Sequence, residues 1–272
     1  DYMELLKYII LGIIQGLTEP LPISSSGHLV LFKNLFNTNM LTDVNFEIVV
    51  NFGSFIAILI IFWKDIIRLI TAFFGFILKK EKRKQYHADF KYCLLIIIGS
   101  IPVGIAGLLF KDKIDEFSGN MTLLGIAFFI TAIMLFLVKN AKGKKEDHDI
   151  TYKDAIIIGL LQMIALTPGI SRSGTVLVGC LLCGLSRKAS LKYTFMLYFP
   201  VSVASMGLGV VDMIQDSSLT TLWLPYLCGL IAAGIVTYFS YQWLSKMVQN
   251  GKLWKFSIYC LCLSIFVLFY FR

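Results

Sequence analysis

The sequence predicts an all-α polytopic membrane protein made of two inverted-topology repeats, each a re-entrant helix pair followed by three transmembrane helices. The first observation is composition: 57% of the residues are hydrophobic and 15% are charged, whereas soluble domains carry about a quarter charged residues. The second is a set of long apolar windows, each able to cross about 30 Å of hydrocarbon. Helices are expected there because only helices and closed barrels satisfy the backbone in lipid. The predicted spans are residues 47–63, 93–110, 121–138, 193–211, 222–245 and 254–271.

The third observation is an internal repeat between two polar stretches at a constant offset of 147 residues. The matched positions are Gly12 with Gly159, Gln15 with Gln162, Ile23 with Ile170, Ser24 with Ser171, Ser26 with Ser173, and Gly27 with Gly174. Prolines and glycines interrupt both stretches, and proline removes a helical hydrogen bond. Segments 8–31 and 155–185 are therefore predicted to enter the membrane as a helix, unwind, and return to the same side. One such broken segment in each half indicates a site at the repeat interface.

The chain is predicted to form a single membrane domain, 1–272, with repeat 1 at 1–140 and repeat 2 at 150–272. Three spans per repeat is an odd number, so the second repeat starts on the opposite face from the first. The charges favour this topology, because nineteen of the 25 Lys and Arg fall in loops on one predicted face. Those loops are 64–92, 139–154, 186–192 and 246–255. The positive-inside rule places them in the cytoplasm and both termini outside.

The net charge of +8 lies in these loops and does not indicate nucleic-acid binding. The apolar stretch 66–78 is flanked by basic residues. It is predicted either to extend a span or to form an interfacial helix.

Arg172 lies within the second broken segment, and arginine at membrane depth is costly and usually functional or paired. Its planar guanidinium matches the oxygens of a phosphate group. Ser171 and Ser173 flank it, and a broken backbone can turn N–H groups toward an anion. The pattern predicts a phosphate site. The alternative is an Arg172–Glu19 ion pair that only holds the two repeats together.

The first broken segment supplies the candidate nucleophiles Ser24, Ser25, Ser26 and His28. Serine needs an adjacent base to attack at neutral pH. His28 follows Ser25 by three residues, so one helical turn is predicted to bring its ring near that hydroxyl. Direct attack by His28 is the competing interpretation. In the repeat Ser25 is matched by Arg172, so a candidate nucleophile and a candidate phosphate clamp occupy equivalent positions.

Glu19 follows Gln15 by one helical turn, so both side chains project from the same helix face. A carboxylate and an amide oxygen suit a hard divalent cation such as Mg²⁺ or Ca²⁺, and the pair is a candidate metal site. A structural hydrogen-bonded pair is the alternative. Glu47, at the start of the first full span, either faces the same cavity or lies at its rim.

Two motifs carry a resemblance to a known family. The first runs from Gln15 through Glu19 and the Ser24–Ser26 run to His28, and the second is the Pro168-Gly-x-Ser-Arg-Ser segment. They resemble the two signatures of the bacterial undecaprenyl-pyrophosphate phosphatases, also called bacitracin-resistance phosphatases.

The resemblance implies hydrolysis of undecaprenyl pyrophosphate to undecaprenyl phosphate, which recycles the lipid carrier of cell-wall polymers. It implies a multi-pass protein of the bacterial plasma membrane with an active site opening to the outer face. It also implies that Ser25 is the nucleophile, His28 and Glu19 assist, and Arg172 binds phosphate. The other substrate-binding candidates are Ser24, Ser26, Ser171, Ser173 and Thr175.

Two positions depart from the family pattern. Gln15 is the neutral version of a position that holds glutamate or glutamine, which weakens the case for a two-carboxylate metal site. Val176 stands where the second motif has threonine. Either Thr175 supplies that hydroxyl through a shifted backbone, or the hydroxyl is dispensable.

The expected partners are undecaprenyl pyrophosphate, whose tail would lie between spans, and membrane lipids. A homodimer and a monomer are both left open. A transporter or flippase for a phosphorylated lipid or anion is the alternative function, because inverted repeats with broken helices are a transporter design. Another membrane phosphatase class, with a histidine after its motif arginine, is disfavoured because no histidine follows Arg172.

Overall fold

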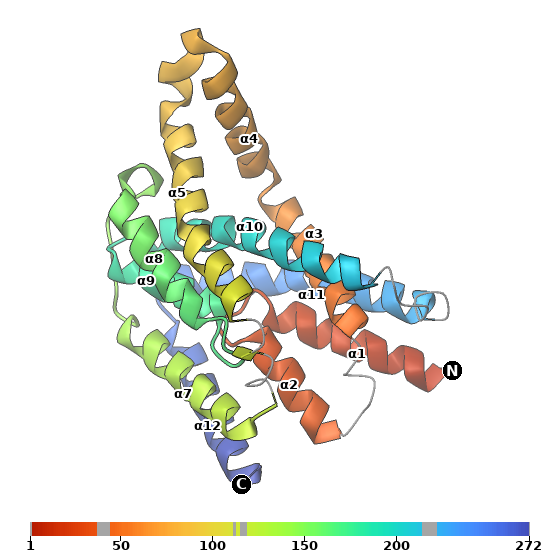
Figure 1. The fold of residues 1–272 in the computed structure, drawn as a ribbon. Helices are drawn as coiled ribbons and strands as arrows, with labels where there is room; N and C mark the ends of the chain where they lie inside the picture. The colour runs from red at the N-terminus through yellow and green to blue at the C-terminus, as the bar shows by residue number, and fades with distance from the viewer. Residues whose placement is uncertain (1, 37–43, 111–112, 115–118, 214–221, 272) are drawn as a thin grey trace.

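The structure is a computed structural model that describes residues 2–36, 44–110, 113–114, 119–213 and 222–271. The described residues are helical, apart from loops and one isolated bridge between Lys145 and Leu185. The first half contains α1 (Tyr2–Thr18), α2 (Ser25–Phe36), α3 (Val44–Ile61), α4 (Trp63–Leu78), η2 (Lys80–Lys82), α5 (Arg83–Leu109) and α7 (Met121–Leu137). The second contains η3 (Asp147–Asp149), α8 (Tyr152–Ile164), α9 (Arg172–Leu182), α10 (Arg187–Met213), α11 (Trp223–Gln249) and α12 (Trp254–Tyr270). Figure 1 shows their arrangement.

The prediction of apolar helices is confirmed, since each of the six predicted spans falls on a helix. By length and composition alone, Lys80–Leu109 and Trp223–Gln249 can each cross a membrane. The pair Asn45–Ile61 and Trp63–Leu78 also qualifies if its two helices, bent by 77°, are counted together. The helices α7 and α12 are apolar but have 17 residues each, which is the lower end of the range for a span.

Both predicted breaks are present. In the first, α1 ends at Thr18 and α2 begins at Ser25; in the second, α8 ends at Ile164 and α9 begins at Arg172. Each new helix starts in the same way, because a serine side chain accepts a hydrogen bond from the glycine N–H three residues on, which is N-capping. Ser24 accepts from Gly27 (3.2 Å) and Ser171 from Gly174 (3.0 Å). The repeated serine–glycine spacing therefore encodes a helix start.

The two breaks lie against each other at the centre of the molecule (Figure 1). A Cβ on Gly27 would come within 2.8 Å of the Gly169 Cα atom, so only glycine permits this approach. Gly169 has a φ of +93°, a region that glycine adopts without steric cost. The Ser173 hydroxyl also donates to the Leu21 carbonyl oxygen at 3.1 Å. Side chains that begin helices far apart in sequence are thus brought together.

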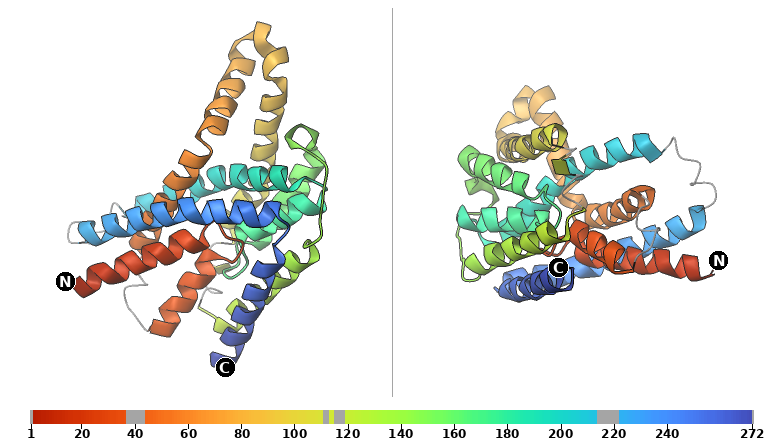
Figure 2. Two further views of the ribbon diagram at one scale, coloured as in Figure 1. Left: turned by 180° about the vertical axis from the view of Figure 1, so that it is seen from behind. Right: turned by 60° about the horizontal axis from the view of Figure 1, so that its bottom comes forward.

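Each broken segment packs on a long helix of the other half. Helix α1 lies along α11, and α8 lies along α5 (Figure 2). Both crossings are made by pairs of glycines: a Cβ on Gly12 would collide with the Gly229 carbonyl, and one on Gly159 with the Gly99 carbonyl. Small residues at such crossings let helix backbones approach closely in a membrane. Helices α7 and α12 form a further side-by-side pair.

The stretch 66–78 forms most of α4, which turns away from α3 and packs along α5 as a projecting hairpin (Figure 1). A bend of 77° separates this helix from the preceding one, and both predictions for its place in the membrane stay predictions. Lys192 of α10 holds the base of α4, with its Nζ atom 3.1 Å from Asp65 and 2.8 Å from Asp147. Burial lowers the pKa of Lys192, but the hydrogen bonds to Asp147 and Asp65 outweigh it and raise the pKa above its ordinary value.

A second ion pair anchors the start of α8. Asp154 lies 2.9 Å from the Lys145 Nζ atom and accepts hydrogen bonds from the Thr151 backbone N–H and hydroxyl. Thr151 accepts in return from the Asp154 N–H, which completes a capping box. Burial raises the pKa of Asp154, but the Thr151 and Lys145 hydrogen bonds outweigh it and hold the pKa below its ordinary value.

Candidate functional site

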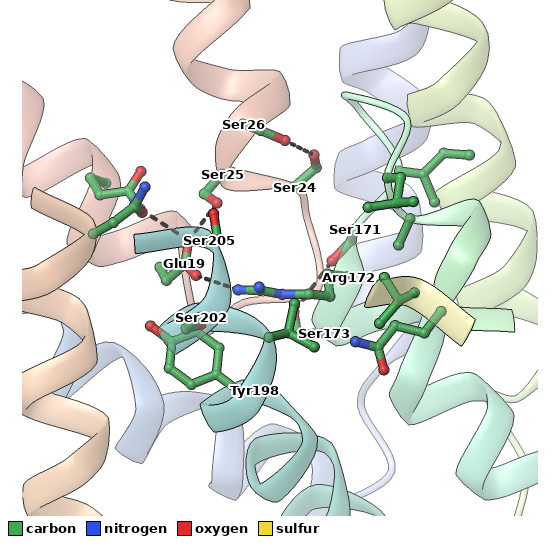
Figure 3. A pocket seen from close by; sticks show the side chains of 18 of the residues that line it. Glu19, Ser24, Ser25, Ser26, Ser171, Arg172, Ser173, Tyr198, Ser202 and Ser205 are labelled. Carbon is green, nitrogen blue, oxygen red and sulfur yellow. Dashed lines mark hydrogen bonds and ion pairs between the residues drawn. The ribbon is translucent and has the colours of Figure 1, made fainter. Parts of the chain in front are cut away.

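A cavity of about 260 Å³ lies where the two breaks meet, and residues of both halves line it. Polar residues from the breaks and from α3 and α10 surround it: Gln15, Glu19, Ser24, Ser25, Ser26, Glu47, Asn51, Gln162, Ser171, Arg172, Ser173, Tyr198, Ser202 and Ser205. Figure 3 shows the labelled side chains converging on one space. The sequence prediction that the repeats build one shared site is thereby matched by a shared cavity.

Arg172 is the first residue of α9 and reaches across the cavity to the first repeat. Its Nη2 atom donates to Glu19 Oε1 at 2.9 Å, and its guanidinium carbon lies 4.9 Å from the centre of the Tyr198 ring. This holds one edge of the guanidinium and leaves Nε and Nη1 without a hydrogen-bond partner among the described residues. The predicted ion pair therefore exists, and the arginine keeps two donors for an anion.

Ser25 is the first residue of α2, and its hydroxyl donates to Glu19 Oε2 at 2.6 Å. The Glu19 side chain is only 8% exposed and also pairs with Arg172. A short bond to an ionised carboxylate is among the stronger hydrogen bonds in proteins. The three groups form a continuous chain from hydroxyl through carboxylate to guanidinium (Figure 3).

His28 lies elsewhere, and the predicted pairing of its ring with Ser25 is wrong for this structure. Its Nδ1 atom donates to the Ser24 carbonyl oxygen at 2.7 Å, so Nε2 accepts from the Tyr259 hydroxyl, also at 2.7 Å. The ring is 3% exposed, stacks on Tyr259 and is not among the cavity-lining residues. Helical geometry turns the ring toward its own preceding turn, where the Ser24 carbonyl oxygen accepts hydrogen bonds from both the His28 backbone N–H (3.1 Å) and the ring N–H.

The other motif serines divide into two kinds. Ser24 and Ser171 are buried N-caps, so their hydroxyl oxygens serve the helix starts. Each shares a hydrogen bond with the next motif serine, Ser26 at 3.4 Å and Ser173 at 3.3 Å. All four line the cavity. The two helix starts therefore lie at the same cavity, and the first N–H groups of a helix have no partner within it.

Thr175, a predicted substrate-binding residue, has its hydroxyl turned into its own helix. It is 1% exposed, and its hydroxyl donates to the Ser171 carbonyl oxygen at 2.7 Å within its own helix. It lines neither the main cavity nor the small pocket beside Arg172. Val176 does line that small pocket. In this structure neither residue therefore presents a hydroxyl to the main cavity.

Gln15 and Glu19, the two residues of the predicted metal site, are joined by a hydrogen bond in the structure. Gln15 directs its amide nitrogen, not its oxygen, to Glu19 Oε2 (2.9 Å) and to Asn51. Its Oε1 atom is buried and has no hydrogen-bond partner among the described residues. Across the described ranges no group of three or more His, Cys, Asp or Glu is placed to hold a metal. Glu19, Glu47 and Gln15 all line the cavity, so they are the candidate sources of oxygen ligands.

Several cavity residues escaped the sequence analysis. The sequence predicts Tyr198 to be a packing residue or part of the aromatic belt at the membrane interface, yet its ring lies under the Arg172 guanidinium. Ser202 and Ser205 lie one turn apart on α10 and face the cavity (Figure 3); two serines at helical spacing in an apolar span are the available signal. Asn51 of α3 binds the Gln15 amide. Glu47 lines the cavity and is exposed. It therefore both faces the cavity and lies at its rim, the two positions predicted for it.

The chain is similar to known proteins over nearly its whole length. The family described as "Bacitracin resistance protein BacA" matches residues 8–266. A protein of Oceanobacillus iheyensis named undecaprenyl-diphosphatase is 40% identical over 272 residues, covering 99% of this chain and 98% of its own. Undecaprenyl-diphosphatase 2 of Bacillus thuringiensis is 41% identical over 270 residues, 99% of each chain. Undecaprenyl-diphosphatase 1 of Halalkalibacterium halodurans is 37% identical, covering 97% of this chain and 95% of its own. The chain therefore belongs to the bacitracin resistance protein BacA family.

Proposed function

We propose that this multi-pass membrane protein is an undecaprenyl-diphosphatase, which removes the terminal phosphate of undecaprenyl pyrophosphate and recycles the cell-wall lipid carrier. The relatives that match over nearly the whole chain carry that name. The observation that carries the proposal is the chain of contacts from Ser25 through Glu19 to Arg172 inside one cavity. It brings a hydroxyl, a proton acceptor and a phosphate-binding cation together from both halves.

The contacts suggest the first chemical step. The Ser25 oxygen attacks the terminal phosphorus, and its proton passes along the 2.6 Å hydrogen bond to Glu19. The bond from that phosphorus to the bridging oxygen breaks, and the bridging oxygen leaves with its electron pair as undecaprenyl phosphate. Glu19 passes its proton to the leaving phosphate and is ready to act again.

A water molecule completes the cycle. Water gives a proton to Glu19 and attacks the phosphorus of phosphorylated Ser25. The phosphorus–oxygen bond to the serine breaks, the serine oxygen takes the proton from Glu19, and inorganic phosphate leaves. In both steps the free edge of Arg172 and the N–H groups of the two helix starts face the charge that develops on the phosphoryl oxygens.

His28 fits a positioning role better than direct attack. Both of its ring nitrogens are engaged, and it fixes the carbonyl of Ser24, the residue before Ser25. Ser24 has a φ of +71°, an unfavourable region for a residue with a side chain. The ring therefore supports the strained residue that sets the position of Ser25.

The divalent cation remains part of the proposal. Mg²⁺ is usually held by one or two carboxylates together with substrate phosphates, and Glu19, Glu47 and the Gln15 oxygen are the donors that the cavity offers. When bound, the cation would neutralise pyrophosphate charge. Because the protein donors are separate, it would bind together with the substrate.

The orientation in the membrane is also proposed. The two halves, 1–140 and 150–272, would be inverted repeats of one domain, with lysine-rich loops in the cytoplasm and the cavity opening to the outer face. The equivalent breaks, caps and glycine crossings of the two halves support this arrangement.

The experiment measures phosphate release from a prenyl pyrophosphate by the purified protein in detergent, where no transport is possible. The proposal expects release that Arg172→Ala abolishes. A protein that binds the pyrophosphate without releasing phosphate would instead be the transporter or flippase alternative.

A further inference from the structure

Gln162 is a buried polar side chain whose polar atoms are unsatisfied. It is 1% exposed, and neither Nε2 nor Oε1 has a hydrogen-bond partner among the described residues. An amide buried without partners lowers stability, because each polar atom has lost its hydrogen bonds to water and gained none in return. Such a group therefore points to a ligand that supplies the missing partner.

The equivalent residue of the first repeat shows why Gln162 is unpaired. Gln15, which precedes it by the repeat offset, donates from Nε2 to Glu19 and Asn51. At the same offset from those two partners the second repeat has Leu166 and Tyr198. Leucine offers no acceptor, and Tyr198 turns its ring to Arg172. The second repeat therefore has the same amide without the two acceptors that Glu19 and Asn51 provide in the first.

The position of Gln162 places that amide at the phosphate site. It lies in the last turn of α8, directly before the break that leads to Arg172. It lines both the main cavity and the small adjoining pocket, and Arg172, Glu19, Ser173 and Tyr198 line these same two spaces. The side chain is therefore buried against protein and borders the same two spaces that Arg172 borders.

We propose that Gln162 is a substrate-binding residue whose Nε2 atom donates a hydrogen bond to a non-bridging oxygen of the phosphoryl group held by Arg172. This inference rests on the proposed phosphatase function. A phosphoryl oxygen is an ionised acceptor, and hydrogen bonds to charged groups are stronger than neutral ones. The substrate supplies the partner that Glu19 supplies to Gln15 in the other repeat.

The proposal predicts that activity and stability respond in opposite directions. Gln162→Met keeps the length of the side chain and removes both unsatisfied atoms, so the empty protein should be as stable as the parent or more stable. The same change removes the donor to the phosphoryl group, so kcat/KM should fall about ten- to hundredfold. A residue retained only for packing would not produce this combination.

The test measures kcat/KM for phosphate release from a prenyl pyrophosphate in detergent, together with the thermal denaturation temperature. Gln162→Glu is the second variant, since it keeps the shape but puts a negative charge beside the phosphate, and it should lose more activity than Gln162→Met. Gln242→Met, an exposed glutamine on α11, is the matched control and should behave as the parent. A further readout is stabilisation by methylenediphosphonate, which should be smaller in both Gln162 variants.

Parent-like kcat/KM, within twofold, in both Gln162 variants would overturn the inference and leave the amide as the holder of a water molecule. A parent protein that releases no phosphate would instead refute the proposed function. In that case a methylenediphosphonate shift unchanged by Gln162→Glu would also refute the binding role. If Gln162→Met does not fold, the Gln162→Glu results decide the question.

Discussion

Replacing Arg172 with lysine tests the positive charge of the side chain separately from the planar shape of the guanidinium. The guanidinium uses one nitrogen for Glu19, and its Nε and Nη1 atoms have no hydrogen-bond partner among the residues that the structure describes. Lysine keeps a positive charge for the carboxylate, but as a compact point charge it cannot also provide a planar fork. Arg172→Lys is therefore expected to preserve the contact between the two breaks while removing the donors aimed at the phosphoryl group.

The size of the effect follows from the number of donors lost. Removing one donor that stabilises developing negative charge costs about 2.7–4 kcal/mol in activation free energy, and each 1.36 kcal/mol is about tenfold in rate. Arg172→Lys should therefore lower kcat by about a hundredfold or more, with a smaller change in KM. Its denaturation temperature should stay near that of the parent because Glu19 keeps a cationic partner.

The assay is phosphate release from a prenyl pyrophosphate in detergent, with thermal denaturation measured on the same preparations. Arg187→Lys is the matched control, because Arg187 donates to the Gln249 carbonyl oxygen away from the cavity. It should retain parent kcat. An Arg172→Lys protein with more than a tenth of the parent kcat would show that the free edge of the guanidinium does not stabilise the transition state, and would refute the reasoning.

Four further outcomes are expected. Ser25→Ala should lose at least a hundredfold in kcat, because it removes the hydroxyl that Glu19 holds; near-parent turnover would eliminate the serine route. Tyr259→Phe leaves the buried His28 Nε2 without its donor and should lower the free energy of unfolding by about 1–3 kcal/mol, measured by denaturation; unchanged stability would contradict that contact. Chelation by EDTA should abolish phosphate release, and added Mg²⁺ should shift the denaturation temperature only together with methylenediphosphonate; a shift with Mg²⁺ alone would indicate a preformed metal site. Because the folded pKa of Asp154 is lowered, its ionisation stabilises the protein above the unfolded pKa of about 3.9 and ceases to do so as pH falls through the folded value. Asp154→Asn should therefore destabilise the protein at pH 7, and the difference in denaturation temperature should shrink below about pH 4; a difference independent of pH would contradict this.

Local sequence patterns were sufficient to predict the long helices and the two breaks. Apolar windows located the long helices, and Pro168, Gly169 and Gly174 marked a break that the structure places between Ile164 and Arg172. The repeat also indicated a shared cavity. The pairing of Ser25 with His28 was wrong, because spacing along a helix says that two side chains are near but not which neighbour each one prefers. The carbonyl of Ser24 and the hydroxyl of Tyr259 compete for the ring, and Tyr259 is distant in sequence.

The sequence by itself determined that the chain is an apolar helical protein with two related polar breaks, because hydropathy, proline and serine–glycine capping act over a few residues. Only the tertiary structure decided which polar groups meet. It joined Glu19 to both Ser25 and Arg172, turned Thr175 into its own helix and left Gln162 unpaired beside the cavity. These pairings depend on how α1 packs against α11 and α8 against α5, and contacts between helices so far apart in the chain are set by packing that no local pattern records.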